Sequence, residues 1–204
     1  MGEKPKEKKF NYEVFAYEKV LSGELKTFSP YFFNMRYRKK RLTTLIKYLI
    51  EEKLGMTGEE ALTKLDKATI KKYKLQCILK YIEKPVELEK NDLSYIVYYA
   101  YPELNPPTNK ELTLEYYKKV LNQEKRNFPK NYFSDGLLGE ERSVHCVRYL
   151  CEEILEIDRK DIPKKLTVEV LTQYKLKILL TALYFSMHDL ITSVYPNEFS
   201  YNEF

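Results

Sequence analysis

The chain contains the same sequence pattern twice, and this internal duplication limits its fold more than any other feature. Residues 17–33 (YEKVLSGELKTFSPYFF) match residues 117–133 (YKKVLNQEKRNFPKNYF) at seven of seventeen positions. Residues 47–79 match residues 148–180 at eleven of thirty-three positions, and each copy ends in a helix followed by Tyr-Pro. Three matching blocks in the same order predict two tandem copies of one structural unit.

The matching blocks also set the predicted domain organisation. The linker between the copies holds Pro106 and Pro107, so we expect it to be fairly stiff. The predicted segments are a charged N-terminal tail with the start of the first helix (1–16), repeat 1 (17–104), the proline-bearing linker (105–112) and repeat 2 (113–204).

Composition and periodicity indicate that both copies are helical. Six glycines in 204 residues are too few for the many tight turns of a β-sandwich or β-barrel. Leu42, Leu45, Ile46 and Leu49 have the i, i+3, i+4, i+7 spacing of one helical face. The second helix of repeat 1 is therefore predicted here.

A long, largely buried helix is predicted as the fourth of each copy. Asp66 and Thr167 are suitable N-caps for it, and Leu75 and Ile78 lie on its apolar side. A short third helix, which Thr57 and Glu60 open with capping-box spacing, precedes it, so the two helices form a helix-turn-helix-like corner. We predict an all-α fold in which two tandem copies of a roughly five-helix unit pack together.

Several motifs resemble a known sequence family. They are the Asp-Ile-Pro-x-x-Leu-Thr element (Asp161, Ile162, Pro163, Leu166, Thr167), the Tyr-Lys-Leu block, and Tyr-Pro-x-x-Phe (Tyr195, Pro196, Phe199). This pattern resembles an uncharacterised repeat family of low-GC Gram-positive bacteria and their mobile elements. The resemblance covers both copies and implies a structural repeat, with no established activity to carry over.

Motifs for enzymatic chemistry are absent from the sequence. The three cysteines include no CxxC pair, the two histidines form no HExxH, and neither a P-loop nor GxGxxG occurs. We therefore predict a non-enzymatic protein with no catalytic residues, no metal and no cofactor. The charged N-terminus lacks the apolar run of a signal peptide, and no apolar stretch has the length of a membrane span. A cytoplasmic location is expected.

Charge is distributed unequally between the copies. Residues 17–110 hold 18 basic and 12 acidic residues, whereas residues 111–204 hold 13 and 15. The excess is concentrated in Arg36, Arg38, Lys39, Lys40 and Arg41, at the start of the predicted second helix. The corresponding GLLGEERS stretch of repeat 2 has almost none of it. Because cations are unfavourable at a helix N-terminus, folding does not explain the cluster, and an anionic partner does.

A second group of basic residues begins the predicted fourth helix: Lys67, Lys71, Lys72 and Lys74. In a helix-turn-helix, the first residues of the second helix face the major groove. We therefore predict a regulatory protein that binds nucleic acid, with duplex DNA as the expected form. In this reading the Arg36 to Arg41 cluster contacts phosphates, and Lys67, Lys71 and Lys72 lie near a groove.

A protein-binding function is the alternative. Tyr95, Tyr98 and Tyr99 lie in the predicted fifth helix, and exposed tyrosines provide contact area at low entropic cost. The same spacing also describes core packing, so both interpretations of these tyrosines stay open. The sequence does not decide between a monomer and a homodimer.

Overall fold

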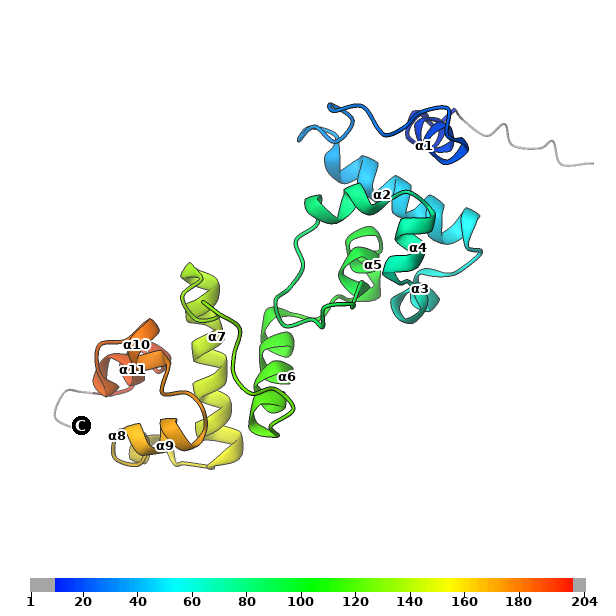
Figure 1. The fold of residues 1–204 in the computed structure, drawn as a ribbon. Helices are drawn as coiled ribbons and strands as arrows, with labels where there is room; N and C mark the ends of the chain where they lie inside the picture. The colour runs from blue at the N-terminus through cyan, green and yellow to red at the C-terminus, as the bar shows by residue number, and fades with distance from the viewer. Residues whose placement is uncertain (1–9, 200–204) are drawn as a thin grey trace, which may run out of the picture. The chain divides into compact units, whose positions relative to one another are not determined.

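A computed structural model describes residues 10–199, and this part of the chain is helical without any strand. It divides into two compact units, Met1–Pro106 (unit 1) and Pro107–Phe204 (unit 2). Figure 1 colours unit 1 from blue to green and unit 2 from green to red. Residues 1–9, which hold most of the predicted charged tail, and 200–204 lie outside the described residues. The predicted all-α fold of two tandem units is confirmed.

Unit 1 is built from short helices. Its α-helices are α1 (Tyr12–Ser22), α2 (Arg38–Tyr48), α3 (Gly58–Lys64), α4 (Lys67–Lys72) and α5 (Ser94–Ala100). A π-helical turn (Leu49–Lys53) extends α2, and 3-10 turns occupy Gln76–Tyr81 and Pro102–Leu104. Thr57 and Glu60 form the expected capping box at the start of α3.

Unit 2 repeats this order with small changes. Its α-helices are α6 (Asn109–Leu121), α7 (Gly136–Arg148), α8 (Ile162–Lys165), α9 (Val168–Gln173), α10 (Leu179–Ala182) and α11 (Met187–Val194). A π-helical turn (Tyr149–Ile154) extends α7, and a 3-10 turn (Arg159–Asp161) precedes α8. The side chain of Ser186 caps the N-terminus of α11 by accepting a hydrogen bond from the backbone N–H of Asp189.

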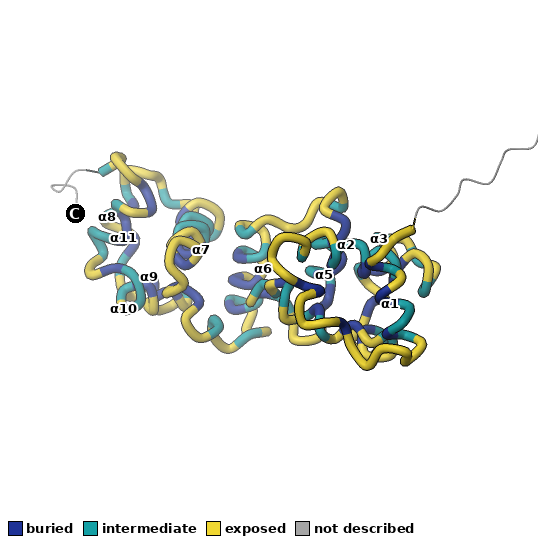
Figure 2. The backbone as a smooth tube through the Cα atoms, turned by 90° about the horizontal axis from the view of Figure 1, so that it is seen from above, coloured by how far each residue is buried: buried dark blue, intermediate teal, exposed yellow. Residues whose placement is uncertain are grey.

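α2 with its π-helical extension supplies more buried side chains than any other helix of unit 1. Leu42, Leu45, Leu49 and Ile50 are completely buried, and both α1 and α5 pack against α2. In Figure 2 the buried stretches lie along the helices, and the connecting loops are mostly exposed. The predicted fourth helix is expected to be largely buried, but α4 buries only Ile70, so this prediction is wrong.

The predicted long fourth helix is also wrong. In unit 1, α4 ends at Lys72, and Lys74 adopts a left-handed backbone with φ of 55°. The hydroxyl of Tyr17 donates a hydrogen bond of 2.7 Å to the carbonyl of Tyr73, so that carbonyl is satisfied without a continuing helix. The helix-turn-helix-like corner therefore joins two short helices.

The same interruption occurs in unit 2. Lys175 has a φ of 65°, and the Tyr117 hydroxyl donates to the carbonyl of Tyr174 over 3.0 Å. The ring of Tyr117 meets Tyr149 edge-on, with 6.1 Å between centroids and 76° between planes. The two units therefore share their internal contacts as well as their sequence blocks.

Candidate nucleic-acid interface

The basic cluster lies where α2 begins. Arg38, Lys39, Lys40 and Arg41 form the first turn of this helix, and Arg36 comes just before it. The N-cap residue makes no side-chain hydrogen bond, and the first turn contains no acidic residue. Four cations thus lie at the positive end of the helix dipole, where they disfavour the helix.

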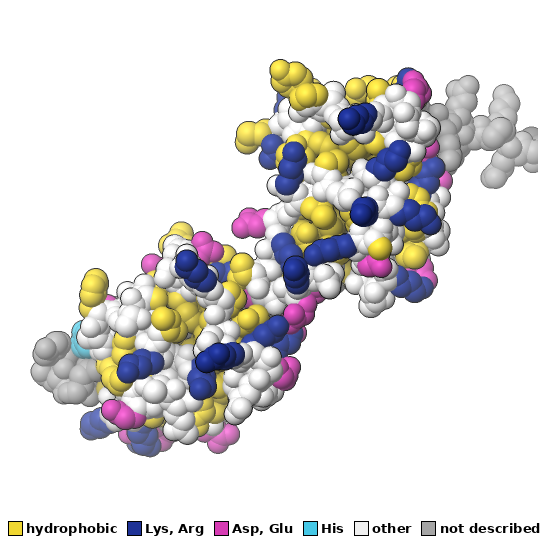
Figure 3. Space-filling view, in the orientation of Figure 1, with side chains coloured by type: hydrophobic (Ala, Val, Ile, Leu, Met, Phe, Trp, Pro, Cys, Tyr) yellow, Lys and Arg dark blue, Asp and Glu magenta, His cyan; other side chains and the backbone are white. Residues whose placement is uncertain are grey.

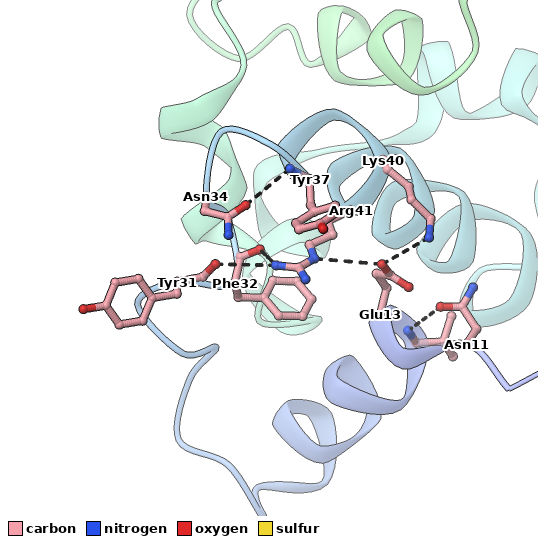
Figure 4. Close-up of polar contacts among 9 residues, drawn as sticks. Asn11, Glu13, Tyr31, Phe32, Asn34, Tyr37, Lys40 and Arg41 are labelled. Carbon is pink, nitrogen blue, oxygen red and sulfur yellow. Dashed lines mark hydrogen bonds and ion pairs between the residues drawn. The ribbon is translucent and has the colours of Figure 1, made fainter.

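Arg41 differs from the other cations of the cluster because it is packed into the fold. Its Nη1 donates to the carbonyl of Phe32, and its guanidinium lies 4.8 Å from the Phe32 ring centroid and 5.0 Å from that of Tyr37. Its Nε is 3.9 Å from a carboxylate oxygen of the buried Glu13, and only 16% of its side chain is exposed. Figure 4 shows these contacts. Arg41 holds the aromatic loop against α1 and α2.

Unit 2 contains the counterpart of this arginine. Nη1 of the buried Arg142 donates to the carbonyl of Tyr132 over 3.1 Å, and its guanidinium lies 4.5 Å from the Tyr132 ring centroid. An oxygen of Asp135 lies 3.4 Å from the same Nη1. One member of the cluster is therefore a structural residue that both copies share.

The remaining cations face solvent to different degrees. Arg36 and Lys39 are exposed, and the Lys40 side chain is 71% exposed, with its Nζ 3.6 Å from Glu13 Oε1. Arg38 is partly buried, because its Nε donates to the carbonyl of Phe33 over 3.1 Å. Arg36, Lys39 and Lys40 are thus the members best placed to meet a partner.

Lys80 joins this group from a distant part of the sequence. The Arg38 guanidinium and the Lys80 ammonium lie 5.0 and 4.9 Å from the ring centroid of Tyr81. Sequence reasoning missed Lys80 because the 3-10 turn that carries it was assigned to a continuous helix. The signal was present, since the corresponding residue of repeat 2 is the uncharged Thr181.

Large apolar side chains stand exposed among these cations. Tyr31 and Met35 are 81% and 84% exposed, and Tyr37 and Tyr12 are also exposed. Figure 4 shows the Tyr31 ring directed away from the helices. In Figure 3, Lys and Arg side chains are interspersed with hydrophobic ones over the visible side of unit 1. We define the basic–aromatic face as Tyr31, Met35, Arg36, Tyr37, Lys39, Lys40 and Lys80.

Two lysines of the corner region serve the fold. Nζ of Lys67 donates to the carbonyl of Lys90 over 2.8 Å and so fastens the long loop before α5. Nζ of Lys74 donates to the carbonyl of Val20 over 2.9 Å, near the C-terminus of α1. A cation there interacts favourably with the negative end of the helix dipole.

Lys71 and Lys72 are exposed but lie away from the cluster. The Lys72 ammonium is 5.5 Å from the Tyr73 ring centroid, and the Tyr73 hydroxyl is 3.5 Å from the carbonyl of Lys53. Lys53 ends the extension of α2, about 20 Å from Arg38 at 1.5 Å per helical residue. The structure does not bring these lysines together with the Arg36 to Arg41 cluster.

The equivalent surface of unit 2 carries the opposite charge. Arg41 and Arg142 make the same contact with the loop, so we treat them as equivalent positions. Glu140 and Glu141 then correspond to Lys39 and Lys40. Gly139 replaces Arg38, and a Cβ at Gly139 would lie 2.2 Å from the carbonyl oxygen of Phe133. The loop of unit 2 therefore leaves no room for a side chain at that position.

The tyrosines of the alternative prediction are partly engaged in packing. Tyr95 and Tyr99 pack against the core of unit 1, and burial raises the pKa of both phenols. Tyr98 is also partly buried. The large exposed aromatic side chains of unit 1 are thus found near α1 and the loop before α2, not in α5.

Other chemically reactive groups are few. Cys77, Cys146 and Cys151 are free thiols, and burial raises the pKa of Cys146 and brings that of Cys151 to about 11. Residues 10–199 contain no group of three or more His, Cys, Asp or Glu side chains that could hold a metal ion. Within the same range, no helix has both the length and the apolar character needed to cross a membrane.

Comparison with known proteins identifies both copies. The family described as Protein of unknown function (DUF4046) matches residues 14–105 and again residues 113–200. No curated protein and no solved structure matches the chain.

Proposed function

This chain belongs to the DUF4046 family, and we propose that it is a non-enzymatic regulatory protein that binds nucleic acid through the basic–aromatic face of unit 1. Arg36, Lys39, Lys40 and Lys80 contact phosphates. Unit 2 contributes no phosphate contacts at its equivalent surface. The protein acts in the cytoplasm, which agrees with its free thiols. From the resemblance of its motifs, we also propose a source among low-GC Gram-positive bacteria and their mobile elements.

The observation that best supports this proposal is a difference in charge between the two units, at the residues just before the shared arginine. Arg41 and Arg142 hold the same loop in the two units, but the two residues before them are Lys39 and Lys40 in one and Glu140 and Glu141 in the other. Lys39 and Lys40 lie in the first turn of α2, where cations disfavour the helix, so these lysines are there at a cost in helix stability. An anionic ligand offsets that cost when it binds.

Nucleic acid is the anion that suits this surface. Phosphates repeat along a strand, so several cations spread over α2 and the turn at Gln76–Tyr81 can be engaged at once. Release of the counterions condensed on the strand then drives binding. Arg36 and Lys39 are exposed, and Lys40 loses only a weak pairing with Glu13 when it turns to a phosphate.

Fluorescence anisotropy with labelled oligonucleotides of mixed sequence, single-stranded and duplex, tests the proposal. For about four phosphate contacts, the logarithm of the association constant should fall against the logarithm of salt concentration with a slope of about −3 to −4. Lys39→Glu with Lys40→Glu should weaken binding at least ten-fold and flatten this slope.

The control is Lys164→Glu with Lys165→Glu in unit 2, which changes the net charge equally at another pair of exposed lysines. This variant should bind nearly as well as the parent protein. Equal losses in the two double variants would point to net charge alone and contradict a site in unit 1. So would the absence of binding to every oligonucleotide at low salt.

A further inference from the structure

We infer that the basic–aromatic face takes single-stranded nucleic acid, with bases stacked on Tyr31 and Tyr37 and phosphates paired with the surrounding cations. This inference rests on the proposed function and specifies its ligand. It departs from the duplex DNA that the helix-turn-helix-like sequence pattern suggests.

The first argument is the exposure of the rings. Tyr31 is 81% exposed and Tyr37 is 41% exposed, so both rings present apolar area to solvent. The aligned residue of repeat 2 is Asn131, which has a left-handed backbone with φ of 59°, so repeat 2 has no aromatic ring at this position. Unpaired bases have apolar faces that stack on aromatic side chains, whereas bases within a duplex are already stacked on one another. Exposed rings therefore gain more from a single strand.

The second argument is that a solvent-exposed cation lies beside one of the rings. The Arg36 guanidinium is 5.3 Å from the Tyr37 ring centroid. A single strand carries both phosphates and bases, so it can use a surface that combines exposed cations with exposed rings. An acidic peptide would satisfy the cations but leave the rings without partners.

The third argument is that one ring is held in place before any ligand binds. The guanidinium of the largely buried Arg41 lies 5.0 Å from the centroid of Tyr37, and the Tyr37 backbone N–H donates to Asn34 Oδ1 over 3.3 Å. A stacking platform that is already ordered loses little conformational entropy on binding.

The helix-turn-helix-like corner does not offer an equivalent fit to a duplex. Its second helix, α4, has six residues, and Lys67 at its start is fastened to the Lys90 carbonyl. Lys71 and Lys72 lie at the opposite end of α2 from the basic–aromatic face. The corner thus presents little helix to enter a major groove.

Three ligands of equal length distinguish single-strand binding from duplex binding and from binding to phosphates alone. They are a single-stranded oligonucleotide, the same sequence as a duplex, and an abasic strand with the same number of phosphates. We expect the single strand to bind at least ten-fold more tightly than either of the others in moderate salt. Equal binding of the intact and abasic strands would overturn the inference, and so would tighter binding of the duplex. A poly-glutamate peptide that competed as well as the oligonucleotide would also overturn it.

Replacing Tyr31 and Tyr37 by the aligned residues of repeat 2 tests whether their rings contribute to binding. Tyr31→Asn and Tyr37→Leu introduce the side chains of Asn131 and Leu138, which occupy these places in a folded unit. Each should weaken single-strand binding by on the order of ten-fold and change duplex binding little. Tyr31→Phe should retain binding. Phe185→Ala is the matched control, because Phe185 is a fully exposed aromatic residue of unit 2.

The chain has no tryptophan, so one introduced indole can report stacking directly. In a Tyr31→Trp variant, the indole fluorescence should be quenched by the intact single strand and not by the abasic strand. Absence of quenching with a bound oligonucleotide would place the bases elsewhere and overturn the inference. Failure of this protein to bind any nucleic acid would instead remove the proposed function, so the two failures are distinguishable.

Discussion

Arg41 in unit 1 and Arg142 in unit 2 donate to the carbonyl of the equivalent loop residue, yet the two residues before each arginine have opposite charges. The arginine is retained because the loop carbonyl needs a donor in either unit. Its neighbours are free to change because they face solvent. Residues of the same six-residue cluster therefore differ in role: the arginine stabilises the fold, and we propose that its exposed neighbours bind a partner.

The counter-charges of the two arginines differ as well. Arg41 has the buried Glu13 of α1 within 3.9 Å, whereas Arg142 has Asp135, which precedes α7, within 3.4 Å. The residue of repeat 2 that corresponds to Glu13 is Thr113, which is also buried. The negative charge has therefore moved from one element to another while the arginine has kept its role.

The largest expected effects concern two equivalent tyrosines, Tyr17 and Tyr117, whose hydroxyls donate to the backbone carbonyl that follows α4 and α9, respectively. Tyr17→Ala and Tyr117→Ala should each lower the stability of their own unit by about 3–5 kcal/mol, because each removes a completely buried ring. Tyr17→Phe and Tyr117→Phe remove only a hydroxyl and should cost about 1 kcal/mol. Hydrogen exchange resolved by unit in the full chain measures all four. If a substitution lowered the stability of one unit by less than half as much as the matching substitution lowers that of the other, the two tyrosines would not be equivalent.

Next in size are substitutions that divide the basic cluster. Arg41→Met and Arg142→Met leave a loop carbonyl without its donor and should cost about 1–3 kcal/mol in their respective units. Arg36→Met, at an exposed position of the same cluster, should change stability by less than about 0.5 kcal/mol. Denaturation of the full chain followed by hydrogen exchange provides the comparison. If Arg36→Met lowered the stability of unit 1 as much as Arg41→Met does, Arg36 would also stabilise the fold. The proposed division of the cluster into structural and partner-binding residues would then be wrong.

Much of the fold could be predicted because the relevant signals are local or repeated. The duplication, the helical class and the Thr57–Glu60 capping box follow from residue order alone. The length of the fourth helix could not be predicted, because apolar residues such as Leu75 and Ile78 continue the helical spacing past its end. The helix ends before Lys74, which has a left-handed backbone, and the adjacent Tyr73 carbonyl accepts a hydrogen bond from Tyr17, more than fifty residues away.

The candidate site was found from sequence only in outline. Comparison of the repeats singled out the Arg36 to Arg41 cluster, because charge differs most there. The role of Arg41 depends on a loop that folds back onto α2, and the approach of Lys80 depends on a shared contact with Tyr81. Such long-range contacts are decided by tertiary packing, so neither could be inferred from spacing along the chain.

A smaller effect is expected from exchanging the charges that distinguish the units. Lys39→Glu should stabilise unit 1 by about 0.3–1 kcal/mol, since it places an anion at the N-terminus of α2. Glu140→Lys should change the stability of unit 2 by less, because Glu140 lies beyond the first turn of α7. Denaturant midpoints at low and high salt measure both, and salt should reduce each effect. If Lys39→Glu were destabilising, the lysine would serve the fold, and its link to an anionic partner would lose support.

The smallest expected effect comes from His145 in α7, whose counterpart in repeat 1 is Thr44. His145 lies in a pocket of about 320 Å³ between α6 and α7 with Lys110, Arg148 and Glu152. Burial lowers its pKa, as do the charges of Lys110 and Arg148, while Glu141 opposes them. The protonated form is therefore less favourable in the folded unit than in the unfolded chain.

Unit 2 should consequently lose stability as the pH falls below about 6.5, the ordinary pKa of histidine, and gain nothing from this group above that value. His145→Thr, which installs the residue of repeat 1, should remove this part of the acid sensitivity. Unit-resolved hydrogen exchange at pH 7.5 and 5.5 measures it, after correction for the intrinsic pH dependence of exchange. Because carboxylates titrate in both units, the informative quantity is the difference between parent and variant in unit 2 at the lower pH. If parent and variant lost the same stability between pH 7.5 and 5.5, protonation of His145 would cost no more in the folded unit than in the unfolded chain. The positive charges of Lys110 and Arg148 would then be screened at this site.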